Sequence, residues 1–196
     1  MTSSFDLSKH PIALVPSWRR TLGDKVRLSF AHYRYRPQTI EDQRERFTCQ
    51  IRDVTPDWLM LQVSNLKPGY ELALESIVLG RREVLHIPMI DFADSVISAT
   101  LFRKRTNKFI GIDLVFFNSG RSFHGYGTKC LSEADWVTFM GLALLQNGPN
   151  RKPLVDTRWV GHRLVAGYAA LRWSLNSSHY LKWPTLIGST NLNPDT

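Results

Sequence analysis

The sequence of 196 residues has little cysteine and no long apolar run. Its two cysteines, Cys49 and Cys130, are isolated, and neither belongs to a Cys-x-x-Cys pair or to a zinc-type spacing with histidine. The pattern therefore gives no sign of a disulfide framework or a zinc site. No stretch of about 18 apolar residues occurs, and the first residues lack the charged start and apolar segment of a signal peptide. We expect a protein of the reducing cytoplasm that does not enter a membrane.

Acidic residues are outnumbered by basic ones. The chain has 25 lysines and arginines against 17 aspartates and glutamates, which gives a formal net charge of +8 and a pI near 9.8. Such an excess favours an acidic partner, and nucleic acid is the expected one. The hydrophobic share of 43% is ordinary for a globular protein with one core. We expect a single domain over residues 1–187 and a flexible tail over residues 188–196.

Two tracts carry the basic excess. In the predicted strand from Val26 to Tyr35, arginines alternate with aromatic rings, which is typical of a surface that binds single-stranded nucleic acid. A charged edge strand, protected against aggregation, explains the same pattern equally well. The tract 103–108 has four cations and no acid, so it is a solvated hairpin tip or a contact to a nucleic-acid backbone. The residues predicted to bind nucleic acid are Arg27, Arg34, Arg36, Arg103, Lys104, Arg105 and Lys108.

The most distinctive stretch reads Asn-Ser-Gly-Arg-Ser-Phe-His-Gly-Tyr and follows an apolar strand predicted over 109–117. Its glycines, Gly120 and Gly125, allow a positive φ and a close backbone approach. Arg121 can hold a phosphate through two hydrogen bonds, and His124 can donate to one. The stretch is thus suited to a phosphate, although an ordinary hairpin turn with an exposed arginine explains the spacing as well.

An aspartate follows each of two further apolar segments. Asp91 comes directly after a strand predicted over 83–90, in which Pro88 indicates an edge position or a bulge. Asp156 precedes a helix predicted over 157–170, so it also has the position of a helix N-cap. A carboxylate at either position is a possible metal ligand, and for Asp156 the capping role is the simpler explanation.

In order along the chain, these stretches resemble the three motifs of the archaeo-eukaryotic primase superfamily. The first is Leu85-His86-Ile87-Pro88-Met89-Ile90-Asp91-Phe92, the second is Asn118 to Tyr126 with its Ser-Gly-x-x-x-His pattern, and the third runs from Leu154-Val155-Asp156 through Leu171-Arg172-Trp173-Ser174 to Lys182. The resemblance covers roughly residues 84–184 and is closest to the small divergent primase-like domains of bacterial conflict and defence gene clusters.

The resemblance implies an α+β fold, in which a curved, mostly antiparallel sheet carries helices near 132–147 and 157–170. Residues 1–83 would form a basic, strand-rich part, and residues 84–187 would carry the motifs. The implied catalytic ligands of Mg²⁺ or Mn²⁺ are Asp91, Asp156 and Asp94. The residues implied to bind a nucleoside triphosphate are Ser119, Gly120, Arg121, His124, Arg172 and Lys182.

One departure from the family pattern concerns the first motif. The family usually has Asp-x-Asp, whereas this chain has Asp91-Phe92-Ala93-Asp94, so the second carboxylate is displaced by one position. A shift of one residue along a strand turns a side chain to the opposite face. Asp94 would therefore need a bulge or a strand end to join Asp91.

Two functional hypotheses follow, and Ala93 divides them. The first is a primase- or polymerase-type nucleotidyltransferase that binds a nucleoside triphosphate, divalent metal and nucleic acid, in replication, repair or defence. The alternative is a catalytically inactive nucleotide- or nucleic-acid-binding subunit of a larger complex with other proteins. A purely structural scaffold is disfavoured by the basic excess.

The remaining segments have no obvious chemistry. We expect residues 1–16 to be an arm or edge segment and residues 47–54, 58–63, 95–102, 171–175 and 180–183 to be strands. Residues 71–79 fit a helix or a strand. Ser132 to Asp135 has the form of a capping box and predicts that a helix begins there. His162 and His179 are expected to be surface or core residues rather than ligands.

Overall fold

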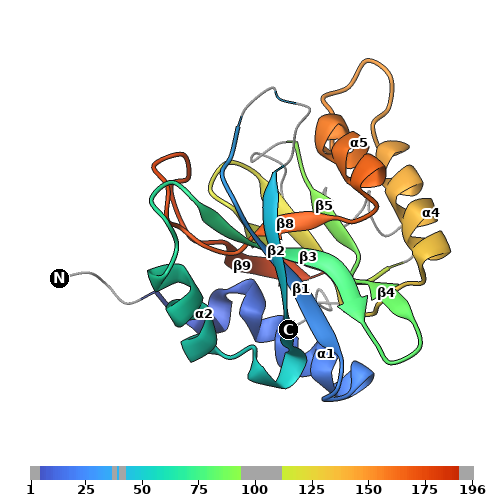
Figure 1. The fold of residues 1–196 in the computed structure, drawn as a ribbon. Helices are drawn as coiled ribbons and strands as arrows, with labels where there is room; N and C mark the ends of the chain where they lie inside the picture. Colours follow the sequence, from blue (N-terminus) through green and yellow to red (C-terminus); the bar gives the residue numbers. More distant parts are fainter. Residues whose placement is uncertain (1–4, 37–38, 40–42, 94–111, 190–196) are drawn as a thin grey trace, which may run out of the picture.

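The computed structural model describes residues 5–36, 39, 43–93 and 112–189. These residues form two antiparallel sheets with four α-helices around them (Figure 1). Helices α1 and α2 lie at one end of the sheets, and α4 and α5 lie together along one side. The predicted α+β fold with mostly antiparallel strands is therefore confirmed.

The larger sheet has five strands in the order β2-β1-β3-β4, with β8 also paired to β3. They are β1 (Arg27–Tyr33), β2 (Arg44–Gln50), β3 (Glu71–Leu79), β4 (Val84–His86) and β8 (Ala170–Arg172). The central strand β3 is buried along almost its whole length. Burial on both faces explains why its sequence lacks clean alternation and fits a helix as well as a strand.

The smaller sheet has four strands in the order β5-β7-β6-β9. They are β5 (Met89–Asp91), β6 (Leu114–Asn118), β7 (Phe123–Gly127) and β9 (Thr185–Ser189). Strands β6 and β7 form a hairpin whose turn is the phosphate-type stretch singled out above. Because β5 pairs with β7, the end of β5 lies beside that hairpin.

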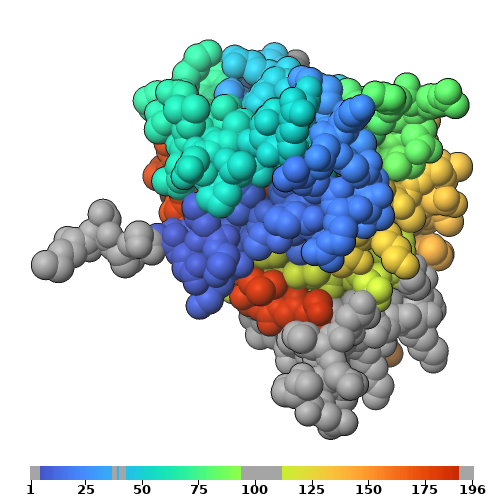
Figure 2. Space-filling view, turned by 90° about the horizontal axis from the view of Figure 1, so that it is seen from below, coloured from blue at the N-terminus to red at the C-terminus, as the bar shows by residue number. Residues whose placement is uncertain are grey.

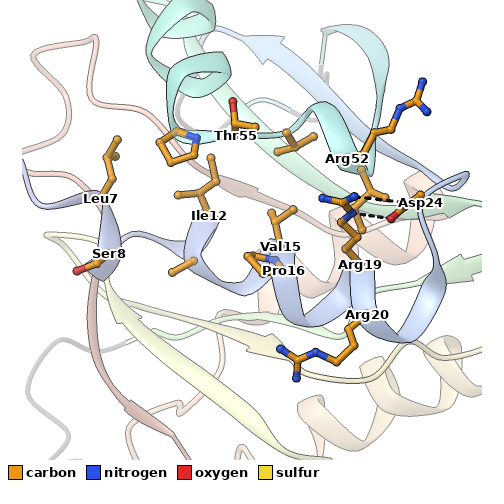
Figure 3. Close-up of a pocket in the computed structure, with 14 residues that line it drawn as sticks. Leu7, Ser8, Ile12, Val15, Pro16, Arg19, Arg20, Asp24, Arg52 and Thr55 are labelled. Carbon is orange, nitrogen blue, oxygen red and sulfur yellow. Dashed lines mark hydrogen bonds and ion pairs between the residues drawn. The ribbon is translucent and has the colours of Figure 1, made fainter.

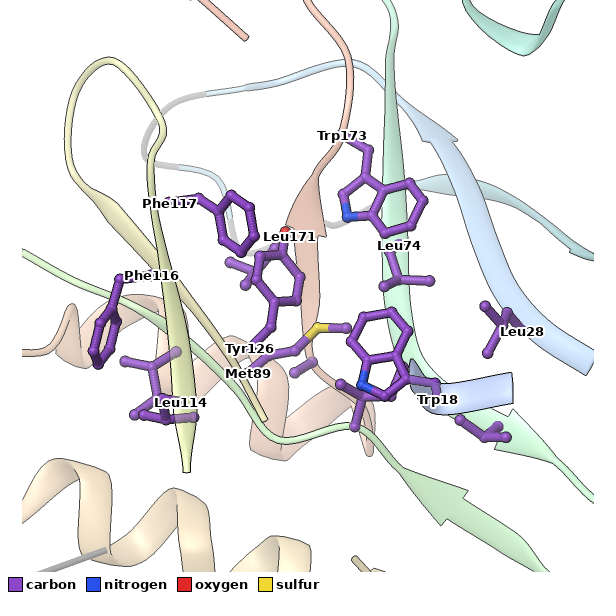
Figure 4. Packing of buried hydrophobic residues seen from close by; sticks show 14 of the residues in the cluster. Trp18, Leu28, Leu74, Met89, Leu114, Phe116, Phe117, Tyr126, Leu171 and Trp173 are labelled. Carbon is purple, nitrogen blue, oxygen red and sulfur yellow. The ribbon is translucent and has the colours of Figure 1, made fainter. Parts of the chain in front are cut away.

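The hydrophobic core lies between the two sheets (Figure 4). Tyr126 and Phe117 point from the hairpin toward Leu74 and Leu171 of the larger sheet. Trp18 of α1 packs in the same layer of buried side chains. All five side chains are at most 2% exposed. Trp18 also donates its indole N–H to the Gly127 carbonyl at 2.9 Å, which fixes α1 (Val15–Leu22) on the hairpin.

The segment 83–90 is not one strand, as predicted, but two short strands in different sheets. It breaks at Ile87 and Pro88, so that β4 stays in the larger sheet and β5 enters the smaller one. Proline cannot donate to a sheet ladder, and here its carbonyl accepts from Gly127 at 2.7 Å. A Cβ at Gly127 would lie 2.6 Å from the Pro88 ring, so only glycine fits there. The break directs Asp91 to the hairpin.

The prediction of an arm or edge segment at residues 1–16 is wrong for residues 5–16, which the structure describes. Residues 7–14 form two 3-10 turns, η1 (Leu7–Lys9) and η2 (Pro11–Leu14), that lead directly into α1. His10 is fully buried, accepts from Ile12 N at 3.0 Å and contacts the Trp173 carbonyl at 2.7 Å. Figure 2 shows the described N-terminal residues, in blue, on the face of the molecule seen from below. The segment is therefore part of the packed domain.

Helix α2 (Pro56–Ser64) replaces the strand predicted at 58–63. The Thr55 hydroxyl caps the helix by accepting from Trp58 N at 3.2 Å, and Pro56 occupies the first turn. Both are ordinary helix-start signals, and Asp57 in the first turn adds a favourable dipole interaction. The preceding strand, predicted at 47–54, ends at Gln50 and continues as η3 (Ile51–Asp53).

The two helices of the motif-bearing part occur where the sequence predicts them. Helix α4 (Glu133–Leu144) starts at the Ser132 cap, whose hydroxyl accepts from Asp135 N at 3.2 Å. Helix α5 (Thr157–Ala166) starts at Asp156 and ends earlier than predicted, because Gly167 takes a left-handed conformation with φ of 77°. This stop leaves room for β8, which begins at Ala170.

The C-terminal part differs from its prediction in detail. Residues 180–183 form no strand, and β9 follows them at 185–189, so Gly188 and Ser189 belong to a strand rather than to the tail. The strand predicted at 95–102 and the basic tract 103–108 lie outside the described residues. Among the helices that the structure describes, none has the length and apolar character needed to cross a bilayer.

Candidate functional site

A cavity of about 420 Å³ opens where β1, β5 and the β6–β7 hairpin meet the start of α5. Its lining combines acidic, basic and aromatic side chains. The lining includes Tyr33, Arg34, Tyr35, Arg36, Tyr70, Asp91, Ala93, Ser119, Arg121, Ser122, His124, Asp156, Arg172, His179 and Tyr180. The three stretches singled out in the sequence therefore reach one cavity.

Asp91 and Asp156 are held side by side by the backbone. Asp156 N donates to the Asp91 carbonyl at 3.0 Å, and the next pair, Phe92 and Val155, forms an antiparallel bridge. The Asp156 carboxylate also caps α5, because its Oδ1 accepts from Trp159 N at 2.9 Å. The capping role predicted for Asp156 is thus present, and it leaves the carboxylate on the lining of the cavity.

The Asp91 carboxyl group has an unusual proton affinity. Burial raises its pKa to about 7, and the nearby Asp156 charge adds to the rise. The Ser122 hydroxyl opposes the rise by donating to Asp91 Oδ1 at 3.0 Å. Two carboxylates in a partly desolvated place repel each other, so a cation between them would be stabilised.

This donor set fits one hard divalent cation. Mg²⁺ is commonly bound through one or two carboxylates, with water and phosphate oxygens completing its shell. Asp91 and Asp156 provide such a pair. No group of three or more acidic, histidine or cysteine side chains with metal-binding geometry occurs among the described residues, and Asp94 lies outside them. The two described carboxylates suit a metal that arrives with a phosphate ligand.

The turn between β6 and β7 is closed by its own side chains. Asn118 Oδ1 accepts from Gly120 N at 2.8 Å, and the buried Ser119 hydroxyl donates to the Ser122 carbonyl at 2.9 Å. Gly120 has the predicted positive φ, 99°. Ser119 therefore shapes the turn, while Ser122, which the motif reasoning passed over, reaches Asp91. Arg121 is exposed at the tip and lines the cavity.

His124 lies in β7 rather than in the turn, directly opposite Asp91 in the β5–β7 register. Its Nε2 is 3.9 Å from Asp91 Oδ1, and its buried Nδ1 has no hydrogen-bond partner among the described residues. Burial lowers its pKa to about 3, and the Arg172 charge acts in the same direction. His124 is therefore neutral and can donate one N–H to an anion. Gly125, next to it, serves close packing against Phe92 and does not have a positive φ.

Arg172 is buried and makes hydrogen bonds to two loops. Its guanidinium donates to the carbonyls of Ser119 at 2.6 Å and Lys182 at 3.1 Å, and also to that of Ser174. It lies 4.0 Å from the centre of the Tyr180 ring. Arg172 therefore supports the turn and adds positive charge beside it. The Lys182 side chain is exposed, packs toward Gly120 and is not among the residues that line the cavity.

A buried carboxylate that sequence reasoning missed orders the second of these loops. Glu71 of β3 is fully buried and accepts from Asn176 N at 3.1 Å, from Ser177 N at 2.7 Å and from the Ser177 hydroxyl at 2.7 Å. It also accepts from the Ser174 hydroxyl. Residues 174–177 are thereby fixed just before His179 and Tyr180, which line the cavity. No local motif signals this role, because Glu71 and the loop are about a hundred residues apart.

The residues predicted to bind nucleic acid are distributed unevenly. Arg34 and Arg36 follow β1 and line the cavity, whereas Arg27 lies at the other end of β1 and binds Thr48. Arg103, Lys104, Arg105 and Lys108 lie outside the described residues. Of the alternating rings in the predicted strand 26–35, Phe30 is in the core, and only Tyr33, in β1, and Tyr35, just after it, reach the cavity.

A second cavity, of about 640 Å³, lies between the N-terminal turns with α1 and the η3–α2 segment (Figure 3). Its lining is largely aliphatic, with Ile12, Val15 and Val54. Its acid, Asp24, accepts from Arg19 at 2.6 Å and is thus paired. The described residues that line it include no carboxylate pair and no histidine. Of these two cavities, the first therefore has the side chains suited to a metal and a phosphate.

Comparison with known proteins places the chain in a family. The family model described as archaeo-eukaryotic primase 1D-like matches residues 50–185, and the chain belongs to this archaeo-eukaryotic primase family. The resemblance noted in the sequence is thereby confirmed. A search of curated proteins gave no match.

A solved structure supports the same assignment at the level of the fold. The catalytic domain of the primase RepB', crystallised in complex with initiator DNA, matches with a TM-score of 0.52 and 12% sequence identity. The match covers 89% of this chain and 82% of that chain. It includes most of the N-terminal part that the three motifs do not reach. The protein is therefore a primase-like domain.

Proposed function

We propose that this domain binds a nucleoside triphosphate together with a divalent metal ion in the Asp91–Asp156 cavity, as primase-type nucleotidyltransferases do. The observation that carries the proposal is the shared lining of that cavity. The lining contains two adjacent carboxylates, an exposed arginine on a glycine turn and a neutral buried histidine. A cation and a polyphosphate are together the simplest ligand for such a set.

Each residue has a definite role in this proposal. Asp91 and Asp156 hold the metal, which when bound neutralises phosphate charge and activates a hydroxyl nucleophile. Arg121 binds the outer phosphates through hydrogen bonds from its guanidinium group, and His124 donates one N–H to them. Ser122 keeps the Asp91 carboxylate oriented through its 3.0 Å hydrogen bond. Arg172 stabilises the turn that presents Arg121.

A binding module with little or no turnover is the second candidate, and Ala93 favours it. Ala93 is exposed, lines the same cavity as Asp91 and follows it by two residues. It therefore stands where the family pattern has its second carboxylate. With an alanine at that position, binding of one metal ion with the triphosphate is supported better than a two-metal reaction.

Ala93→Asp is expected to raise any polymerising activity with Mn²⁺.

Loss of the Arg121 side chain is expected to weaken triphosphate binding without unfolding the protein, because the residue is exposed at a turn. Removing one charge-assisted contact costs on the order of 1.5 to 3 kcal/mol, or roughly 10- to 150-fold in affinity. Calorimetric titration of a nucleoside triphosphate with Mn²⁺ measures the effect. Arg82→Ala, an exposed arginine in the β3–β4 turn, is the matched control. Equal affinity of Arg121→Ala and Arg82→Ala would reject the phosphate assignment.

Nucleic-acid binding through phosphates is the other part of the proposal. The net charge of +8 and the position of Arg34 and Arg36 at the cavity support it, and the RepB' domain, of the same fold, was crystallised with DNA. We expect affinity for single-stranded DNA to fall steeply between about 50 and 200 mM salt. Arg34→Ala with Arg36→Ala should reduce the slope of log K against log salt by about 2. Fluorescence anisotropy measures both, and salt-independent binding would contradict a phosphate-based contact.

A further inference from the structure

One wall of the Asp91–Asp156 cavity is aromatic, and neither the metal nor the phosphates account for it. The rings of Tyr33, Tyr35, His179 and Tyr180 line this wall and contact one another. They come from two separate places: the end of β1 with the residues that follow it, and the loop before β9. The fold has thus gathered rings from distant parts of the chain beside a candidate triphosphate site.

Two of these rings form a stacked pair. The Tyr35 and His179 rings have centroids 4.2 Å apart and an angle of 26° between their planes. Tyr35 remains 43% exposed, whereas the Tyr33 ring is 8% exposed and its hydroxyl contacts that of Tyr180 at 3.2 Å. The Tyr180 ring is further covered by the Arg172 guanidinium. Tyr35 therefore offers the open aromatic surface on this wall, backed by His179.

The stacked pair is joined directly to the phosphate-type turn. The Arg121 guanidinium can only donate, so His179 Nε2 accepts its hydrogen bond. Burial, and then the charges of Arg121 and Arg172, lower the His179 pKa, which favours the neutral ring that accepting requires. A flat surface thus lies next to the cation that would hold the outer phosphates. A nucleoside triphosphate has this combination of parts, with a planar base at one end and a polyanion at the other.

We propose that Tyr35, backed by His179, is the stacking surface for the base of the bound nucleoside triphosphate. Stacking on a ring does not read hydrogen-bonding groups, so this surface accepts any of the bases and favours the larger purines. The inference rests on the proposed triphosphate site and adds to it the part of the cavity that recognises the nucleoside.

The alternative role for the pair is to position Arg121 without touching the base. The two roles differ in their effect on a ligand that has no base. A positioning pair affects inorganic triphosphate and nucleoside triphosphate alike, whereas a stacking surface affects only the nucleotide. Comparison of these two ligands therefore separates them.

The experiment titrates the full chain with ATP, UTP and inorganic triphosphate, each with Mn²⁺, by calorimetry. For the wild type we expect ATP to bind more tightly than UTP and both to bind more tightly than inorganic triphosphate. Tyr35→Ala should weaken ATP binding by roughly 5- to 100-fold and leave inorganic triphosphate within about 2-fold. Tyr35→Phe should keep the wild-type preference, because the ring is retained. Thermal melting of each variant confirms that it is folded.

Two results would overturn the inference while leaving the triphosphate site standing. One is a wild type that binds nucleotide and inorganic triphosphate equally. The other is a Tyr35→Ala variant that weakens both ligands alike or neither. A wild type that binds none of the three ligands would overturn the proposed function together with the inference.

Discussion

Asp91→Asn is expected to make the metal-free protein more stable at pH 8. Burial and the Asp156 charge raise the Asp91 pKa from 3.8 to about 7. Between these two values the folded state binds a proton that the unfolded state does not, so stability falls as the pH rises from about 4 to 7. Above pH 7 the full cost of the buried charge is present, and the amide removes it.

The size of this gain in stability follows from the pKa shift of Asp91 and from the exposed fraction of its side chain. A change of three pKa units corresponds to at most about 4 kcal/mol. Because the Asp91 side chain is still 25% exposed, water screens part of the cost, and we expect about 1 to 2 kcal/mol. That corresponds to a rise in melting temperature of roughly 3 to 6 °C.

Thermal unfolding of wild type and variant between pH 4 and 8, with chelator present, measures the effect. The two curves should converge toward pH 4, because the folded wild-type carboxyl is protonated there and no longer carries a buried charge. Glu83→Gln, which neutralises an exposed acid in the β3–β4 turn, should change the melting temperature little at any pH. An Asp91→Asn variant that is less stable than wild type at pH 8 would contradict the described environment of Asp91.

The second large effect, a loss of nucleotide affinity, is expected on substitution of Asp156. Asparagine caps helices as well as aspartate does, so Asp156→Asn should keep the hydrogen bond to Trp159 N and the start of α5. It removes the negative charge from the cavity. Since loss of even an outer-shell partner of a metal costs 10- to 100-fold, loss of a direct ligand should weaken Mn²⁺-supported nucleotide binding by at least about 100-fold.

Asp156→Ala is the companion variant, because it removes both the charge and the cap. It should match Asp156→Asn in nucleotide affinity and lose, in addition, about 1 kcal/mol of stability. Calorimetry and thermal melting on the two variants separate the capping role from the metal role. Asp156→Asn with wild-type nucleotide affinity would mean that the residue is only a cap.

Much of the fold could be predicted from local signals. The α4 and α5 helices, strand β1 and the β6–β7 hairpin follow from their caps, apolar patterns and turn residues. The errors arose where tertiary structure decided the outcome, or where a helix-start signal was not recognised as one. Pro88, predicted to mark an edge or bulge, divides its segment between two sheets, and Thr55-Pro56-Asp57 begins a helix where a strand was predicted at 58–63.

The candidate site was predictable only in part, because its members come together through tertiary structure. The motif resemblance predicted Asp91, Arg121, His124 and Asp156 as site residues, and all four line one cavity, while their roles stay predictions. It could not predict that Ser122 rather than Ser119 reaches Asp91, since both hydroxyls belong to one turn. The contributions of Glu71, His179 and Tyr35 arise from contacts between residues far apart in the chain, which spacing does not encode.

The most direct test of the account is to locate Mn²⁺ by anomalous diffraction in crystals grown with a non-hydrolysable nucleoside triphosphate. We expect an anomalous peak about 2.0 to 2.6 Å from carboxylate oxygens of both Asp91 and Asp156, with a phosphate oxygen in the same shell and Arg121 on the outer phosphates. A triphosphate bound elsewhere, or a metal that touches neither aspartate, would contradict the central claim.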